Sequence, residues 1–424
     1  MKIRANMNMI LENCFIPRHG TLVHSTVEIG TEGRIIKITK LSDKKYGFPT
    51  AHASSKVTSV LNCGGNILSP GFIDIQINGA FGVDFSSEKT TKEHVLRVAK
   101  GLAKHGVTHF CPTLISCSKD TYKKMIPMLS SICQHDDNSM VSGKRAKILG
   151  LHLEGPFFCA AKRGAHHLGN IVEEMNETVL TETYGFNSSD LKKLGVCIIT
   201  LAPELKGASD AIEDFTKSGI AVAMGHTNAN LEQGIIAKAK GATLITHLFN
   251  AMRTFHHREP GLLGLLQTND TEESNLFYSI IVDGLHSHPT SVKMAYSMSK
   301  NAVLITDAMS ALDLGDGQHT LGDSTVHVNG NSATILGTDV LAGSIASMDS
   351  CIRSFIEFTG CSIVEALNAA TYNPAKVLGL DQSLGSIEEG FLANLVLLDE
   401  NLNVMKTFSS GNVIYSSDTN HLQI

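Results

Sequence analysis

Several side chains that can bind a metal ion or move a proton stand at the ends of short apolar runs. The run ILGLHLE closes on Glu154, IAVAMGH on His226, ATLITH on His247 and AVLITD on Asp307. A carboxylate with two imidazoles is a sufficient ligand set for a divalent metal that keeps one coordination position open. The sequence therefore predicts a metal centre formed by Glu154, His226 and His247, and zinc or ferrous iron suits these ligands.

Asp307 ends the last of these runs and can serve as a general base that takes a proton from an attacking water. The alternative is an ordinary helix-capping or turn aspartate. In the same way, each predicted ligand taken alone could be a hydrogen-bonded polar residue at the mouth of a barrel. Three such residues on converging strands favour metal ligation instead.

Eight apolar runs divide the middle of the chain, and seven of them lead into a helical pattern. In chain order they are GFIDIQI (71–77), VTHFCPTL (107–114), ILGLHLE (148–154), VCIITL (196–201), IAVAM (220–224), ATLIT (242–246), FYSIIV (277–282) and AVLIT (302–306). Runs that are apolar on both faces are typical of parallel strands covered by helices. Eight such alternations predict an α/β fold, a closed (β/α)8 TIM-like barrel with its chemistry at the carboxyl ends of the strands. A doubly wound open sheet is the alternative, but it would not explain polar residues at the end of nearly every run.

The two ends of the chain have a different pattern. Residues 1–65 alternate apolar and polar positions around turn signals, which indicates several short antiparallel strands, and residues 383–424 have the same character. We therefore expect one small β-sandwich module built from both chain ends, and a catalytic barrel over residues 66–382. Between Asp307 and Leu341 the sequence predicts only a long loop.

The composition excludes several classes of protein. The chain has 424 residues, of which 42% are hydrophobic and 18% charged, so it can bury a large core. Its net charge of −6 provides no basic field for nucleic acid, and no apolar stretch is long enough to span a membrane. The nine cysteines are scattered without CxxC pairs, and no secretory signal precedes them. These features predict reduced thiols in a soluble cytoplasmic protein.

A set of short motifs runs along essentially the whole chain. They are PGFIDIQINGAFGVDFS (70–86), GLHLEGPF (150–157), KRGAH (162–166), GH (225–226), THLFNAM (246–252), REPG (258–261), DGLH (283–286), TDAM (306–309) and LAGS (341–344). Together they resemble the N-acetylglucosamine-6-phosphate deacetylases of the amidohydrolase superfamily, and the animal forms more than the bacterial ones. The resemblance implies metal-dependent hydrolysis of the acetamide of N-acetyl-D-glucosamine 6-phosphate, which gives glucosamine 6-phosphate and acetate in amino-sugar catabolism.

The resemblance also implies roles for individual residues. It assigns the metal to Glu154, His226 and His247, and the catalytic acid/base function to Asp307. It implies contacts with the sugar phosphate at Ala165, His166, Asn250, Ala251, Arg258, Asp283, Gly284, Leu285, His286, Leu341, Ala342 and Gly343. The guanidinium of Arg258 suits a phosphate because it offers a planar pair of donors. The resemblance further suggests a homodimer, and residues 253–257 are the segment expected to reach across its interface.

One departure from the wider superfamily concerns the number of metal ions. Many members carry His-x-His at the end of the first strand to hold a second metal, where this chain has Gln76 and Asn78. Neutral amides are poor ligands for a transition metal, and no lysine ends the fourth run as a bridging ligand. We therefore expect one divalent metal ion per subunit. The remaining alternatives are another amidohydrolase, acting on a cyclic amide or a nucleobase, and a non-catalytic barrel that serves as a scaffold.

Overall fold

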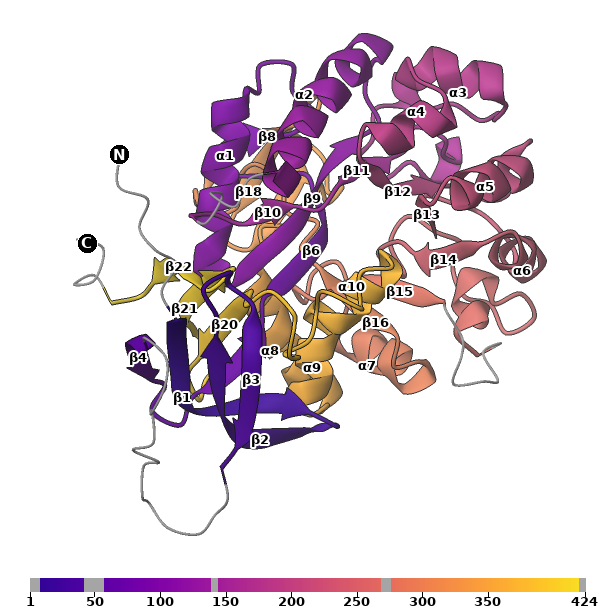
Figure 1. Cartoon of the computed structure of the whole chain (residues 1–424). Coiled ribbons are helices and arrows are strands. Elements are labelled where there is room, and N and C mark those ends of the chain that lie inside the picture. The colour runs from indigo at the N-terminus through magenta and orange to yellow at the C-terminus, as the bar shows by residue number, and fades with distance from the viewer. Residues whose placement is uncertain (1–7, 42–56, 139–143, 268–275, 419–424) are drawn as a thin grey trace.

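Two large sheets organise the molecule, whose computed structural model describes residues 8–41, 57–138, 144–267 and 276–418. One sheet is the parallel barrel, and the other contains strands from both ends of the chain. Figure 1 shows the second sheet to one side of the barrel, with the first and last strands of the chain together in it. Parts of the predicted β-module, residues 1–7, 42–56 and 419–424, lie outside the described residues.

Eight parallel strands form the barrel that the sequence predicts. They are β6 (Phe72–Ile77), β9 (Val107–Ile115), β11 (Leu151–Glu154), β12 (Val196–Leu201), β13 (Ala221–Met224), β14 (Ala242–Ile245), β15 (Phe277–Ile281) and β16 (Ala302–Ile305), with the short β10 (Lys147–Ile148) beside β9. Backbone hydrogen bonds join the last strand to the first: the Asp307 amide donates to the Gln76 carbonyl at 2.9 Å, and the Asn78 amide to the Ala308 carbonyl at 2.8 Å. The predicted barrel fold is confirmed.

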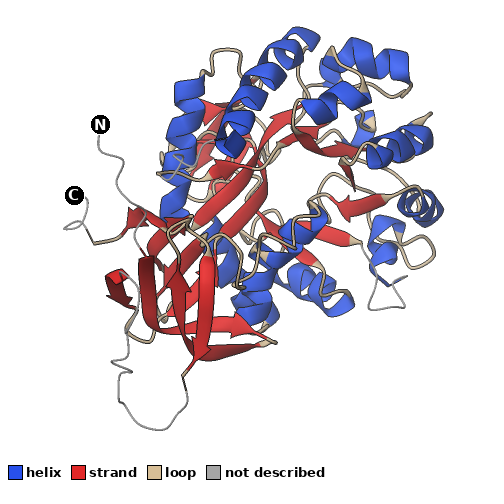
Figure 2. Ribbon diagram, in the orientation of Figure 1, coloured by secondary structure: helices blue, strands red, loops and turns tan. Residues whose placement is uncertain are grey.

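Helices cover the outer side of the barrel strands (Figure 2). They are α1 (Lys92–Gly101), α2 (Lys119–Asn138), α3 (Glu177–Tyr184), α4 (Ser188–Lys193), α5 (Ala208–Lys217), α6 (Leu231–Ala239), α7 (Pro289–Met298), α8 (Met348–Thr359), α9 (Ile363–Ala370) and α10 (Tyr372–Val377), with 3-10 segments η1 (Leu102–His105), η2 (Ala160–Lys162), η3 (Leu168–Asn170) and η4 (Gly261–Gln267). In α1, Val95, Val98 and Ala99 are buried at helical spacing, and Thr91 caps the first turn by accepting a hydrogen bond from the His94 amide. Such helices bury one apolar face against the sheet, which holds the strand ends in place.

The second sheet is built from both chain ends, as expected. Its order is β22-β21-β20-β5-β1-β2-β3, with β4 paired to β1. The strands are β1 (Asn8–Arg18), β2 (Thr21–Ile29), β3 (Ile35–Lys40), β4 (Val57–Asn62), β5 (Ile67–Pro70), β20 (Leu395–Leu398), β21 (Val404–Ser409) and β22 (Asn412–Ser416). The sheet has a core of its own that includes Leu11, Leu68 and Phe408. Because β1 pairs with β4 and β5 in parallel, the expectation of antiparallel strands holds only in part. The domain boundaries stay a prediction.

A three-stranded antiparallel sheet stands where the sequence predicted a long loop. Its strands are β17 (Gly317–Leu321), β18 (Ser324–Asn329) and β19 (Ser332–Ile335), and a shorter hairpin of β7 (Gly79–Ala80) and β8 (Val83–Asp84) follows β6. Two-residue turns at 322–323 and 330–331 join the three strands, as in tight hairpins. The loop prediction was wrong because these strands bury only alternate side chains such as Val326 and Val328, a weaker signal than the barrel runs.

The cysteines are free thiols, as expected for reduced core residues. Seven of them are buried, and Cys159 and Cys197 are partly exposed. Within the ranges that the structure describes, no helix combines the length and the apolar character needed to cross a bilayer.

The contact between the two chain ends can be tested at Gly33. Gly33 has φ +72°, and a Cβ added there would lie 2.2 Å from the Ser410 carbonyl oxygen in the turn between β21 and β22. Gly33→Ala should therefore lower the free energy of unfolding by about 1–3 kcal/mol more than the same substitution at a glycine that has a positive φ but no close neighbour.

Gly20→Ala is the matched control, because Gly20 has φ +75° and nothing within 4 Å of its added Cβ. Thermal unfolding of both variants measures the difference. Equal losses of Tm would mean that the two chain ends do not pack closely at Gly33.

Candidate metal centre and active site

Three of the predicted site residues stand just beyond the ends of their strands. His226, His247 and Asp307 follow β13, β14 and β16, and their φ angles of 48°, 33° and 46° place all three in the left-handed region. Residues other than glycine adopt this region only where surrounding structure holds them there. Glu154 is the last residue of β11. The strand ends thus bring four chemically active side chains to the same mouth of the barrel.

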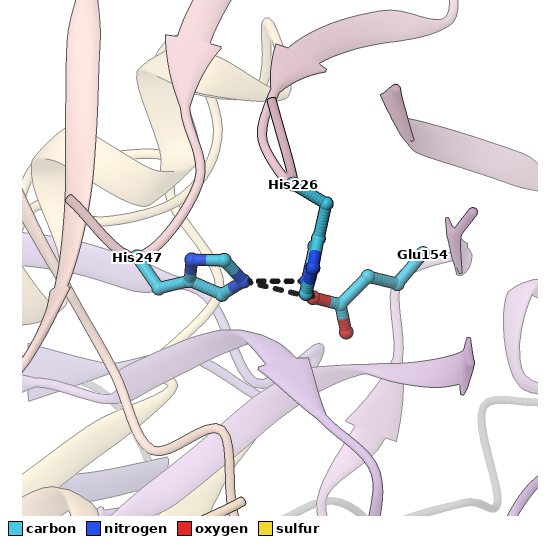
Figure 3. A group of neighbouring side chains, drawn as sticks. All are labelled: Glu154, His226 and His247. Atoms are coloured by element: carbon cyan, nitrogen blue, oxygen red, sulfur yellow. Dashed lines mark hydrogen bonds and ion pairs between the residues drawn. The ribbon is translucent and has the colours of Figure 1, made fainter. Parts of the chain in front are cut away.

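Glu154, His226 and His247 bring three ligand atoms together (Figure 3). Glu154 Oε1 lies 3.2 Å from His226 Nε2 and 3.1 Å from His247 Nε2, and the two Nε2 atoms lie 3.1 Å apart. A tetrahedral zinc site with bonds of about 2.0–2.1 Å separates its ligand atoms by about 3.3–3.4 Å. The triangle is therefore close to the size that a metal requires. Among the described residues this is the one group of three or more acidic, histidine or cysteine side chains that can hold an ion.

Neighbouring hydrogen bonds orient His226 and Glu154. The Nδ1–H of His226 donates to the Lys162 carbonyl at 3.0 Å, which leaves the lone pair of the neutral ring on Nε2. Gln76 Nε2 donates to Glu154 Oε1 at 2.9 Å. Burial opposes ionisation of Glu154, but the close approach of the His226 and His247 imidazole rings to its carboxylate holds its pKa well below the usual range. Glu154 is therefore ionised, which is the form that binds a metal.

Asp307 lies beside this group of three. Its Oδ1 accepts hydrogen bonds from Asn78 Nδ2 at 2.8 Å and from Gln76 Nε2 at 3.4 Å. Burial, reinforced by the charge of Glu154, raises the pKa of Asp307 to about 7. A general base acts best when its pKa is near the working pH. No helix of the described chain begins at Asp307, so the environment suits proton transfer better than helix capping.

Two further histidines belong to the site, and each has a fixed ring orientation. The Ser116 backbone N–H donates to His166 Nδ1 at 3.3 Å, so the proton of the neutral His166 ring is on Nε2. Burial lowers the pKa of His166 to about 3, which keeps the ring neutral. The Nδ1–H of His286 donates to Asp283 Oδ2 at 2.7 Å. His166 therefore offers a hydrogen-bond donor at Nε2, and Asp283 acts on the site through His286.

A cavity of about 130 Å³ joins these groups. Its lining residues are Asn78, Ile115, Glu154, Gly164, Ala165, His166, His226, His247, Asn250, Ala251, Ile281, His286, Asp307, Leu321, Leu341 and Gly343. The structure thus brings the predicted metal ligands, Asp307 and most of the predicted substrate contacts to one place. The predicted residues that do not line the cavity are Arg258, Asp283, Gly284, Leu285 and Ala342.

Four of these five predicted residues fall into two groups. Asp283 and Ala342 lie behind it, since Asp283 holds His286 and Ala342 is fully buried. Leu285 and Arg258 are exposed. Arg258 is the last residue of the exposed segment 254–258. Within a single chain, therefore, the guanidinium predicted to bind phosphate does not reach the cavity wall.

The lining residues Ile115, Gly164, Ile281 and Leu321 were not predicted. Ile115 and Ile281 are the last residues of β9 and β15, so their position at the end of an apolar run was a signal that could have identified them. Leu321 ends β17, in the sheet that the sequence analysis took for a loop, and no signal placed it at the site. Gln76 and Asn78 were predicted to be poor metal ligands, and the structure shows them as donors to Glu154 and Asp307.

Comparisons with known proteins agree with this geometry. A sequence profile described as the Amidohydrolase family matches residues 67–414. Proteins named N-acetylglucosamine-6-phosphate deacetylase from Caenorhabditis elegans and Homo sapiens are each 42% identical, over 95% and 96% of this chain and 93% and 95% of theirs. The crystal structure of a mutant N-acetyl-D-glucosamine-6-phosphate deacetylase from Mycobacterium smegmatis, in complex with N-acetyl-D-glucosamine-6-phosphate, has a TM-score of 0.81 at 27% identity and covers 97% of this chain and 100% of that one.

The chain therefore belongs to the amidohydrolase family. The matched segment includes every predicted site residue. Within the family, the chain groups with the N-acetylglucosamine-6-phosphate deacetylases. Its sequence identity is higher with the animal relatives than with the Mycobacterium smegmatis protein, which confirms the predicted resemblance to the animal forms.

The metal content of the purified protein should plateau near about one equivalent per chain. A second ion would need ligands at the end of β6, where Gln76 and Asn78 already donate to Glu154 and Asp307. Metal analysis by atomic emission, together with activity during titration with a chelator, measures this number. Two tightly bound equivalents in the most active preparations would contradict the prediction.

The same measurement tests the ligand set. His247→Ala should weaken metal affinity by more than about 100-fold, because it removes one of three converging ligand atoms. His327→Ala is the control, since His327 is exposed on β18 and lies outside the cavity lining. Retention of normal metal content by His247→Ala would remove it from the ligand set.

Proposed function

We propose that this protein hydrolyses the acetamide of N-acetyl-D-glucosamine 6-phosphate to D-glucosamine 6-phosphate and acetate, in amino-sugar catabolism. The observation that carries the proposal is the convergence of Glu154, His226, His247 and Asp307 on one cavity. The names of the relatives support the choice of substrate, and so does the sugar phosphate in the Mycobacterium smegmatis complex. A cytoplasmic location and a homodimeric state are parts of the same proposal.

Glu154, His226 and His247 are the proposed ligands of one divalent metal ion per subunit, zinc or ferrous iron. When bound, such an ion lowers the pKa of water towards about 7 and polarises a carbonyl group. The surrounding residues prepare this site. The Lys162 carbonyl holds His226 in the ligating tautomer, and Gln76 fixes the carboxylate of Glu154.

Asp307 moves the protons in the proposed reaction. Its carboxylate takes a proton from the attacking water and later gives a proton to the amine that leaves. Asn78 and Gln76 both bond its Oδ1 atom, which fixes the orientation of the carboxyl group while it performs both steps. The pKa of about 7 that burial produces allows Asp307 to accept and release a proton near neutral pH.

His166 and His286 are the proposed partners of substrate oxygens. The Nε2–H of His166 is a fixed donor, and Asp283 holds His286 in one orientation. One of these two rings polarises the acetamide carbonyl, and the other binds the sugar. Asn250 and the backbone of Leu341–Gly343 bond sugar hydroxyls, while Ala165 and Ala251 complete the wall.

Arg258 is the proposed phosphate ligand. It is exposed in the single chain and does not line the cavity. We therefore place the phosphate at the outer end of the cavity, where residues 253–257 reach towards the partner subunit of a homodimer. The neighbouring side chain of Phe255 is 55% exposed, which favours its burial in such an interface.

The wild-type protein should release acetate from N-acetylglucosamine 6-phosphate, and Asp307→Asn should lose roughly 10²–10⁴-fold in kcat while it retains its metal. The asparagine keeps the shape of the side chain but cannot accept the proton. Acetate release and metal content are measured on the same preparations. Near-normal kcat in Asp307→Asn would exclude it as the acid/base. A wild-type protein that releases no acetate would overturn the proposed function.

Arg258→Ala should raise KM far more than it lowers kcat, by a factor that corresponds to about 2–3 kcal/mol for a charge-assisted hydrogen bond to phosphate. The matched control is the unphosphorylated sugar, N-acetylglucosamine, whose hydrolysis should change little. Equal losses with both substrates would show that Arg258 does not bind the phosphate.

A further inference from the structure

The cavity has an aliphatic wall that the proposed chemistry does not use. The aliphatic lining residues with long side chains are Ile115, Ile281, Leu321 and Leu341. Of these, Ile115 and Leu321 belong to one apolar cluster and form this wall. N-acetylglucosamine 6-phosphate carries hydroxyls, a phosphate and an amide, and its acetyl methyl is its one methyl group. A methyl group is favoured against aliphatic side chains because its burial removes apolar surface from water. The position of this wall relative to the proposed metal ligands therefore matters.

Ile115 lies directly beside Glu154. The two residues are register partners on the parallel strands β9 and β11. Paired residues on neighbouring strands direct their side chains to the same face of the sheet, and the strands are about 4.8 Å apart. Because Glu154 faces the mouth of the barrel, Ile115 faces it as well. An aliphatic side chain is thus adjacent to the carboxylate around which the reaction is proposed to occur.

The corner between β17 and β18 packs on Ile115. A Cβ added at Gly322 would lie 2.8 Å from Ile115 Cδ1, so the backbone of this corner contacts the isoleucine directly. Leu321, the residue before the corner, is 6% exposed and packs in one apolar cluster with Ile115, Met309 and Ala342. Ile115 and Leu321 therefore form one continuous surface, although they are separated by about half of the chain.

The buried residues Asp84 and Ser86 connect to the backbone beside both residues of this surface. Asp84 Oδ2 accepts a hydrogen bond from the Gly322 amide at 2.6 Å, and Asp84 Oδ1 accepts one from the Ser86 amide at 2.8 Å. Ser86 Oγ in turn accepts a hydrogen bond from the Ile115 amide at 3.0 Å. Asp84 and Ser86 are almost fully buried. Hydrogen bonds to a buried carboxylate are strong, so the wall has little freedom to move outward.

We propose that Ile115 and Leu321 form the pocket for the methyl end of the N-acyl group, and that this wall limits the length of acyl group the enzyme accepts. Asp84 is a positioning residue that fixes the wall from behind. The inference rests on the proposed deacetylase function and adds to it the feature that selects acetyl over longer acyl groups.

The test compares three substrates: N-acetyl-, N-propionyl- and N-butyrylglucosamine 6-phosphate. The wild-type protein should prefer the acetyl compound. Leu321→Ala should raise the ratio of kcat/KM for butyryl over acetyl by at least about 10-fold, because one methylene in an apolar pocket changes kcat/KM by about that factor. The ratio does not depend on how much of a preparation is folded, so partial unfolding cannot produce the change.

Two further variants test Ile115, the other residue of the wall, and Asp84, the residue proposed to hold the wall in place. Ile115→Val should raise the same ratio by a smaller factor. Asp84→Asn, which keeps the shape but loses the charge that binds the Gly322 and Ser86 amides, should raise it without a change in metal content. Leu336→Ala is the control, since Leu336 follows β19, is 48% exposed and does not line the cavity.

The outcomes separate the two levels of the proposal. An active wild-type enzyme whose substrate ratio is unchanged in both Leu321→Ala and Ile115→Val overturns the acyl pocket and leaves the deacetylase function intact. An unchanged ratio in Asp84→Asn alone overturns its positioning role. A wild-type protein that hydrolyses none of the three substrates overturns the deacetylase function itself.

Discussion

The site depends on the junction between the first and last strands of the barrel. There the Asp307 amide donates to the Gln76 carbonyl, and the Asn78 amide to the Ala308 carbonyl. The side chains of the same two residues also form hydrogen bonds, since Gln76 donates to Glu154 and Asn78 donates to Asp307. Closure of the barrel and orientation of its carboxylates are therefore produced by the same few residues. Two residues before Gln76 in β6, Asp74 supports the junction by accepting a hydrogen bond from the Thr306 hydroxyl at 2.6 Å.

This junction also explains how the mouth of the barrel can hold unfavourable backbone conformations. His226, His247 and Asp307 all have positive φ angles, which cost energy for residues that carry a Cβ. Each follows a parallel strand that is hydrogen-bonded within the barrel sheet, which limits how far the backbone can relax the strain. The strained positions coincide with the residues that carry the proposed chemistry, as is common where a rigid scaffold imposes the geometry of a site.

The residues of the proposed chemistry and much of the remaining cavity wall come from different parts of the fold. The proposed ligands and acid/base stand at or just beyond the ends of barrel strands, where backbone pairing sets their positions. The remaining wall comes partly from Ile115 and Ile281 at the ends of β9 and β15, and partly from segments outside the barrel strands, among them the KRGAH segment (162–166), the loop after β15 and the three-stranded sheet β17–β19. Such segments can change in length and composition without disturbing the strand ends, which is why barrels of this kind accommodate different substrates.

The sequence by itself determined the barrel, the second sheet with strands from both ends of the chain, and the grouping of Glu154, His226, His247 and Asp307. These follow from local signals, because an apolar run that ends in a polar side chain has the same meaning wherever it occurs in a parallel sheet. Only the tertiary structure decided the aliphatic wall, the exclusion of Arg258 from the cavity lining of a single chain, and the roles of Gln76 and Asn78 as donors. Those features depend on contacts between segments far apart in the chain, such as Gly322 against Ile115, and on half-buried strands whose alternation is too weak to identify from one sequence.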